Sequence, residues 1–321
     1  MRVSLSQQNK NYLNWLLKLA ITAFIAWAIY KQLFAEDNIV EHYDELKDSF
    51  SKHWIWLLAI TFVLMFANWS IEALKWQQVI KKVEPQNFFN SLKAVCIGVA
   101  LGWFVPYRIG EFAGRVFFLK KINRYKGAAV TVVGSYSQIV ATVGVGLLAF
   151  IIYNHTYLPN GHFIYSALAL VALAVLIIMY FKLSAVKNVL FKIFTFKKLK
   201  NLVDLWDLFS FKELLKLLIL SVLRYCTFAL QFYLVFNIFG ISMTFLDGFT
   251  IIGMIFLVQS IIPDFFLLKI GIRGSLAVFF TAVVTSNKLG AEIAPYLLWL
   301  INLIIPAIAG ALFAYRIRFI K

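Results

Sequence analysis

Three charged residues stand close together at the end of a long apolar run, where an unpaired charge is costly in lipid. The stretch FVPYRIGEFAGR, residues 104–115, holds Arg108, Glu111 and Arg115. On a helix that starts at Pro106 these three positions share one face, because they are spaced i, i+3 and i+7. A guanidinium binds two phosphate or carboxylate oxygens at once, and the N-terminal end of a helix favours an anion. The spacing therefore predicts an anion-binding group.

The same stretch also admits a structural interpretation. Glu111 could neutralise the two arginines in an ion network that holds the segment together, and this role is compatible with ligand binding. Gly110 and Gly114 are four residues apart, so they form a small surface that lets another backbone approach closely. Pro106 suits the first turn of a helix, where its missing N–H is not needed. We therefore expect Pro106, Gly110 and Gly114 to be structural residues.

A second apolar run is broken by the same residue types. The stretch IIPDFFLLKIGIRG, residues 261–274, contains Pro263, Asp264, Lys269, Gly271, Arg273 and Gly274. We expect the proline and the glycines to shape this break. Arg273 is the strongest anion-binding candidate here, because Lys269 could instead extend to the external interface and Asp264 could pair with it.

Further polar residues lie inside apolar runs. Arg224 lies within residues 217–239 and must face protein, water or a phosphate, unless it extends to the cytoplasmic end of its helix. Gln231 follows seven residues later on the same helix face. Asn68, Glu72, Ser135 and Gln138 could line the same cavity or form hydrogen bonds between helices. Of these, Gln138 is our candidate for substrate contact.

No catalytic or metal-binding motif accompanies these residues. The sequence has no HExxH, P-loop, nucleophile elbow or paired carboxylates. Cys96 and Cys226 lie inside apolar runs, without a histidine at metal-ligand spacing. We therefore expect no metal, no cofactor and no nameable catalytic residue.

The composition places the chain in a membrane. Hydrophobic residues make up 62% of the sequence, charged residues make up 14%, and the mean hydropathy is +0.81. Apolar runs of about 20 residues suit membrane-crossing helices rather than the short alternating segments of a β-barrel. We predict an all-α polytopic membrane protein with about six full transmembrane helices: 12–34, a run from residue 54, 128–153, 163–181, 217–239 and 293–315. The net charge is +16, and the basic residues lie beside the apolar runs. Because no nucleic-acid-binding signature occurs, we attribute this charge to membrane topology and not to nucleic-acid binding.

The distribution of Lys and Arg predicts the topology, because cytoplasmic loops are rich in both. The basic flanks place both termini and residues 182–216 in the cytoplasm, and Lys75, Lys81 and Lys82 place the end of the second apolar run there as well. Segment 184–213 resembles a basic amphipathic segment on the inner leaflet. Stretches 88–119 and 249–285 are predicted as re-entrant hairpins that enter from opposite sides, although two full crossings each remain the alternative. On the hairpin interpretation, residues 1–153 and 154–321 form an inverted repeat within one transmembrane domain.

The residues around both breaks resemble a known family. VPYRIGEFAGRVFFL and IPDFFLLKIGIRGSLAVFF are similar to segments of the flippase-like family that includes the transmembrane region of lysylphosphatidylglycerol synthase. Its first pattern, Pro-x-Arg-x-Gly-Glu-x-x-Arg, matches from Pro106 to Glu111 and reaches Arg115 with one extra spacer. Its second pattern, Gly-(Val/Ile)-Arg-Glu, matches from Gly271 to Arg273 and departs at Gly274. The stretches ANWSIEALKWQQVI and SVLRYCTFALQF also look familial.

The resemblance implies movement of a charged or phosphate-bearing lipid between leaflets of the cytoplasmic membrane. Bifunctional relatives carry a further aminoacyl-transfer domain, which we do not find here, so we expect no synthesis of an aminoacylated lipid. Together with the charged residues, this favours a lipid flippase or scramblase-like transporter of a lipid with an anionic or phosphate headgroup. The alternatives are a lipid-modifying membrane enzyme and a non-transporting partner in envelope synthesis. The sequence does not determine which lipid is bound or how many copies assemble.

Overall fold

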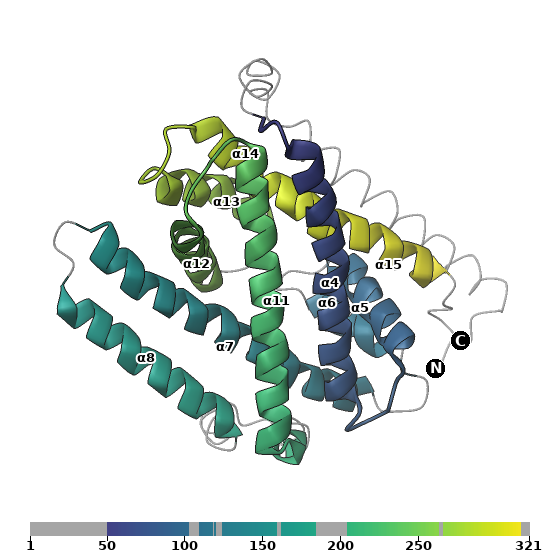
Figure 1. Cartoon of the computed structure of the whole chain (residues 1–321). Coiled ribbons are helices and arrows are strands. Elements are labelled where there is room, and N and C mark those ends of the chain that lie inside the picture. Colours follow the sequence, from purple (N-terminus) through teal and green to yellow (C-terminus); the bar gives the residue numbers. More distant parts are fainter. Residues whose placement is uncertain are drawn as a thin grey trace.

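The protein is a bundle of helices (Figure 1). The computed structural model describes residues 50–102, 109–117, 119, 124–158, 162–183, 204–262 and 266–315, with the backbone alone at 109, 117, 266–271, 314 and 315. The elements are α4 (Trp54–Ile80), α5 (Phe88–Gly102), α6 (Ile109–Phe117), α7 (Arg124–Thr156), α8 (Phe163–Phe181), η2 (Asp204–Leu208), α11 (Phe211–Ile238), α12 (Phe245–Ile261), α13 (Phe266–Thr281), α14 (Lys288–Trp299), η3 (Leu300–Ile304) and α15 (Ile305–Tyr315). No strand occurs in these ranges.

The predicted all-α membrane class is confirmed. Within the described residues, α4, α7, α8, α11 and the continuous run 288–313 are long and apolar enough to cross a membrane. The predicted first span, residues 12–34, lies outside the described residues. The helix predicted from residue 217 begins earlier, at Phe211, because Ser210 and Glu213 form a capping box that satisfies its first N–H groups.

The two long helices α4 and α11 lie side by side and antiparallel at the centre of the bundle (Figure 1). The Ser51 N–H donates to the Ile238 carbonyl at 2.9 Å at one end. Lys82 pairs with Glu213 at 2.7 Å at the other end. We call these the Ser51 end and the Lys82 end. Because a contact joins the two helices at each end, the register between α4 and α11 is set along their whole length.

Helices α5 and α6 form a tightly packed pair. A Cβ atom on Gly114 of α6 would lie 2.6 Å from the Cα atom of Gly98 on α5, and one on Gly110 would lie 2.0 Å from the Leu101 carbonyl oxygen. Only glycine permits such contact between backbones. The C-terminal part of α6 lies at the Lys82 end of the bundle. There a Cβ atom on Gly127 of α7 would lie 3.2 Å from the Val116 side chain of α6 and 3.7 Å from the Ile80 side chain of α4.

Helices α12 and α13 form a second pair at the opposite end of the bundle. The side chain of Asn287, which follows α13, donates to the Phe239 carbonyl before α12 at 2.9 Å. Helix α12 packs on α7, where a Cβ atom on Gly253 would lie 2.4 Å from the Cβ of Ala149. In the same way α5 packs on α15, where a Cβ atom on Gly310 would lie 1.9 Å from the Cys96 carbonyl oxygen. The short helices α5 and α12 thus each pack on a helix that is distant in the sequence, α15 and α7 respectively.

The predicted amphipathic segment 184–213 is described only from residue 204. There the buried Trp206 of η2 donates its indole N–H to the Ala129 carbonyl of α7 at 2.9 Å. Phe209 is also buried. This part of the segment therefore packs against the Lys82 end of the bundle.

Replacing Gly114 with alanine should destabilise the protein, because the added methyl group meets the backbone of α5. Overpacking of this kind costs about 1–3 kcal/mol. Gly144→Ala on α7 is the matched control, because its Cβ atom would meet only the Leu173 side-chain tip at 3.3 Å. Thermal unfolding in detergent micelles should show a lower midpoint for Gly114→Ala alone. Equal midpoints for the two variants would contradict the packing described here.

Candidate functional site

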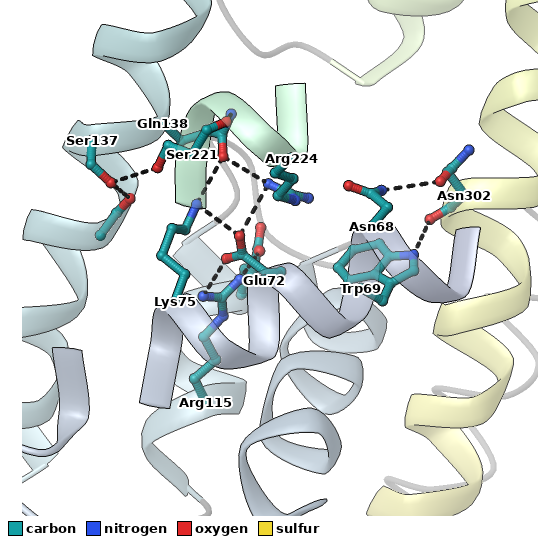
Figure 2. Close-up of polar contacts among 12 residues, drawn as sticks. Asn68, Trp69, Glu72, Lys75, Arg115, Ser137, Gln138, Ser221, Arg224 and Asn302 are labelled. Carbon is teal, nitrogen blue, oxygen red and sulfur yellow. Dashed lines mark hydrogen bonds and ion pairs between the residues drawn. The ribbon is translucent and has the colours of Figure 1, made fainter. Parts of the chain in front are cut away.

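Glu72 of α4 is buried, and its carboxylate binds three cations from three helices (Figure 2). One oxygen, Oε1, accepts from Nη1 of Arg115 on α6 at 2.9 Å. The other, Oε2, lies 2.8 Å from Nζ of Lys75 on α4 and 3.1 Å from Nη1 of Arg224 on α11. This single carboxylate therefore ties α4, α6 and α11 together.

The cluster contains a second carboxylate, Glu111 of α6, which pairs with Arg115. Lys75, Arg115 and Arg224 against Glu72 and Glu111 leave one positive charge in surplus (3 − 2 = 1) among the described members. The side chains of Lys75, Glu72 and Arg115 are 3%, 5% and 6% exposed, whereas those of Glu111 and Arg224 are 14% and 19% exposed. Of these five side chains, Glu111 and Arg224 are thus the most accessible.

Polar groups of α7 extend the cluster. Gln138 Oε1 accepts from Lys75 Nζ at 2.8 Å, and it lies 3.5 Å from Arg224 Nη1, at the limit of a hydrogen bond. Gln138 Nε2 donates to the Ser221 carbonyl of α11 at 3.3 Å. The hydroxyls of Ser137 and Ser221 lie 2.8 Å apart. Together these bonds join α7 to α4 and α11 around the charges.

An aromatic ring covers part of the arginine at this site. The guanidinium carbon of Arg224 lies 5.4 Å from the centre of the Trp69 ring, within the range of a cation–π contact. The Trp69 indole N–H donates to the Asn302 carbonyl at 3.1 Å. Asn68 Nδ2 also donates to Asn302 Oδ1, at 3.1 Å. Figure 2 shows these two contacts beside the charge cluster.

Gly98 of α5 makes room for the side chain of Arg115 on α6. A Cβ atom on Gly98 would lie 2.9 Å from Cγ of Arg115 and 2.7 Å from the Glu111 carbonyl oxygen. The aliphatic part of Arg115 therefore runs across Gly98, and its guanidinium reaches Glu72 of α4. The close packing of α5 on α6 is thus a condition for the charge cluster.

The structure brings four of the predicted substrate-contact residues together: Glu111, Arg115, Arg224 and Gln138. Gly110 and Gly114 lie at the interface of α5 and α6. Arg108, Pro106, Pro263 and Asp264 lie outside the described residues, and Lys269 and Gly271 are described by their backbone in α13 alone. Their predicted roles stay predictions.

The predicted residues of α13 have a separate setting. Arg273 is partly buried in α13, which packs on α12 and α14. A Cβ atom on Gly274 would lie 2.6 Å from the Tyr296 hydroxyl of α14. That Arg273 shares a site with Arg224 stays a prediction.

Sequence reasoning missed the centre of the cluster. Glu72 was considered only as a polar position, and Lys75 was assigned to a cytoplasmic flank. Lys75 lies within α4, which continues to Ile80, and it is 2% exposed, so it is a buried member of the cluster; that it lies on the cytoplasmic side stays a prediction. The spacing of Glu72 and Lys75, i and i+3 within an apolar helix, was the available signal. Gln231 bonds elsewhere, since its Nε2 donates to the Thr61 carbonyl at 2.9 Å.

A comparison of the sequence with models of known protein families shows the family to which the chain belongs. The family described as "Lysylphosphatidylglycerol synthase TM region" matches residues 15–305. The chain belongs to this family. The suspected relation is therefore confirmed, and the protein is a multi-pass membrane protein of a lipid-related family. Searches of curated proteins and of solved structures find no match.

Replacing Glu72 with glutamine should strongly destabilise the protein, because three cations lose their shared counter-charge. Removing one partner of a buried ion pair costs about 3–5 kcal/mol. Glu213→Gln is the matched control, because its pair with Lys82 is exposed and glutamine also completes a capping box. Unfolding in micelles should give a much lower midpoint for Glu72→Gln than for Glu213→Gln.

Removing a cation as well should restore part of this stability. We expect Glu72→Gln/Lys75→Gln to unfold at a higher temperature than Glu72→Gln alone. If Glu72→Gln were as stable as the wild type, Glu72 would not be the counter-charge of the cluster.

Proposed function

We propose that this protein moves a lipid with an anionic or phosphate headgroup between membrane leaflets, as a flippase or scramblase-like transporter. The observation that carries the proposal is the buried charge cluster around Glu72, which spans α4, α6 and α11. Arg224 lies close to the middle of the long helix α11. Ionisable residues at such depth are costly and usually serve a substrate path.

The cations of the cluster favour an anionic ligand. Its described members are three cations and two carboxylates, and a phosphodiester group would be attracted to Lys75 and Arg224, which share one oxygen of Glu72. The planar fork of Arg224 suits two phosphate oxygens, and Lys75 can add a point charge from the same side of Glu72.

Glu72 would act as an internal competitor for the same cations. Its Oε2 atom lies within 3.1 Å of both Lys75 and Arg224, so it occupies the position that a phosphate oxygen would take. A headgroup that enters beside Arg224 would displace the Glu72 carboxylate, which keeps its bond to Arg115 through Oε1. When the headgroup leaves, Glu72 returns, and the cations are never left without an anion.

The packing of the two short helix pairs supports an inverted repeat, which we include in the proposal. Helix α5 packs on α15 as α12 packs on α7, and the two pairs approach from opposite ends of the α4–α11 frame. Inverted repeats of this kind let a transporter open alternately to either side of one central site. Arg108 and Arg273, one at each break, would extend the anion path. We include in the proposal that the protein lies in the cytoplasmic membrane with the Lys82 end and both termini in the cytoplasm, which the basic flanks favour.

Replacing Arg224 with alanine should abolish most transport, because the headgroup loses its two-point contact. The purified protein is reconstituted in liposomes with fluorescent phosphatidylglycerol, and movement between leaflets is followed by quenching of the outer leaflet. Lys216→Ala is the matched control, because Lys216 is an exposed cation on the same helix. We expect about a tenfold or greater loss of rate for Arg224→Ala, consistent with the 1.5–3 kcal/mol of a hydrogen bond to a charged group, and a wild-type rate for Lys216→Ala.

A probe with a zwitterionic headgroup, fluorescent phosphatidylcholine, tests the headgroup preference in the same liposomes. It should move more slowly than the anionic probe in the wild type. Equal rates for wild type, Arg224→Ala and Lys216→Ala with the anionic probe would overturn the proposal.

A further inference from the structure

The carbonyl group of Asn302, in the continuous helical run 288–313, cannot form the hydrogen bond that an α-helix would give it. The Asn302 carbonyl would accept from the N–H of residue 306 in an α-helix, and residue 306 is a proline without an N–H. The chain forms the π-helical turn η3 at this point. Such turns inside α-helices often lie at functional sites. Trp69 of α4 supplies a donor, since its indole N–H bonds the Asn302 carbonyl at 3.1 Å.

The orientation of Asn302 is fixed by its own side chain. Asn302 is 4% exposed, its Nδ2 donates to the Leu298 carbonyl at 3.2 Å, and its Oδ1 accepts from Asn68 at 3.1 Å. The carbonyl that receives the Trp69 indole N–H therefore belongs to a firmly held residue. The bond in turn limits rotation of the Trp69 ring about its side-chain torsions.

The same ring carries Arg224 of the charge cluster. The guanidinium of Arg224 lies 5.4 Å from the ring centre, so the direction of the ring helps to set the direction of the arginine. We propose that Trp69, held by the Asn302 carbonyl, is a positioning residue that aims Arg224 at the anionic headgroup. This inference rests on the proposed function for the identity of the ligand. The link from Asn302 through Trp69 to Arg224 consists of contacts within the chain and does not depend on the ligand.

The matched pair of variants is Trp69→Phe and Trp76→Phe. Both tryptophans are buried on α4, seven residues apart. The Trp76 indole nitrogen has no hydrogen-bond partner among the described residues. Phenylalanine removes similar ring volume at both positions, but only at residue 69 does it remove a hydrogen bond. A difference between the two variants therefore reports the loss of the indole bond together with the smaller ring beside Arg224.

The first readout is the accessibility of Arg224, which does not depend on any lipid. The protein in micelles is treated with phenylglyoxal, which modifies arginine, and modification of Arg224 is measured by mass spectrometry of its peptide. We expect roughly a three- to tenfold faster reaction in Trp69→Phe, the change that matches one net hydrogen bond. Trp76→Phe should react as the wild type does. Equal rates in Trp69→Phe and the wild type, or equal acceleration in both variants, would overturn the inference.

The second readout is the Kd for phosphatidylglycerol in nanodiscs. Trp69→Phe should weaken binding by roughly three- to tenfold, because a misdirected arginine makes a poorer two-point contact. Trp76→Phe should leave the Kd unchanged. If Arg224→Ala binds this lipid as the wild type does, the proposed function fails. The phenylglyoxal result would then still decide whether Trp69 positions Arg224.

A second variant keeps the inference open to refutation if Trp69→Phe does not fold. Pro306→Ala adds an N–H that can bond the Asn302 carbonyl in place of the indole. We expect the competing donor to loosen Trp69 and to raise the phenylglyoxal reactivity of Arg224. An unchanged reactivity in Pro306→Ala would then count against the positioning role.

Discussion

The burial of one carboxylate among three cations is the constraint on which the structure depends. Lys75, Arg115 and Arg224 would each be costly inside a membrane bundle without a counter-charge, and Glu72 lies within 3.1 Å of all three. Since the cations come from α4, α6 and α11, the Glu72 carboxylate reaches all three only when these helices lie together. The charges thus specify the arrangement of the helices, and we propose that an anion binds to the same arrangement.

The cluster in turn depends on glycine. Arg115 reaches Glu72 because α6 lies against α5 at backbone distance, with Gly98 facing Gly114. A larger side chain at either position would separate the helices and draw the guanidinium away. Glycine contacts recur where α5 meets α15 and where α12 meets α7. Close backbone packing therefore holds both short helix pairs in place, one against α15 and the other against α7.

Much of the fold was predictable from the sequence, because membrane helices follow from apolar length alone. The helix 163–181 has the predicted bounds, and Glu111, Arg115, Arg224 and Gln138 meet as residues of one site. The central role of Glu72 was not predictable, because it depends on tertiary contacts with α6 and α11. The burial of Lys75 was not predicted, because a lysine near a helix end has the composition of a cytoplasmic flank, and only its i, i+3 pairing with Glu72 accounts for its low exposure.

The exchange between Glu72 and a lipid phosphate is tested most directly by the affinity of the Glu72→Gln variant for an anionic lipid. The Kd for phosphatidylglycerol is measured in nanodiscs, well below the unfolding temperature of the variant. If the Glu72 carboxylate competes with the headgroup for Lys75 and Arg224, its removal should tighten binding by about tenfold or more, since each 1.4 kcal/mol corresponds to a factor of ten. An unchanged or weaker affinity would contradict the account.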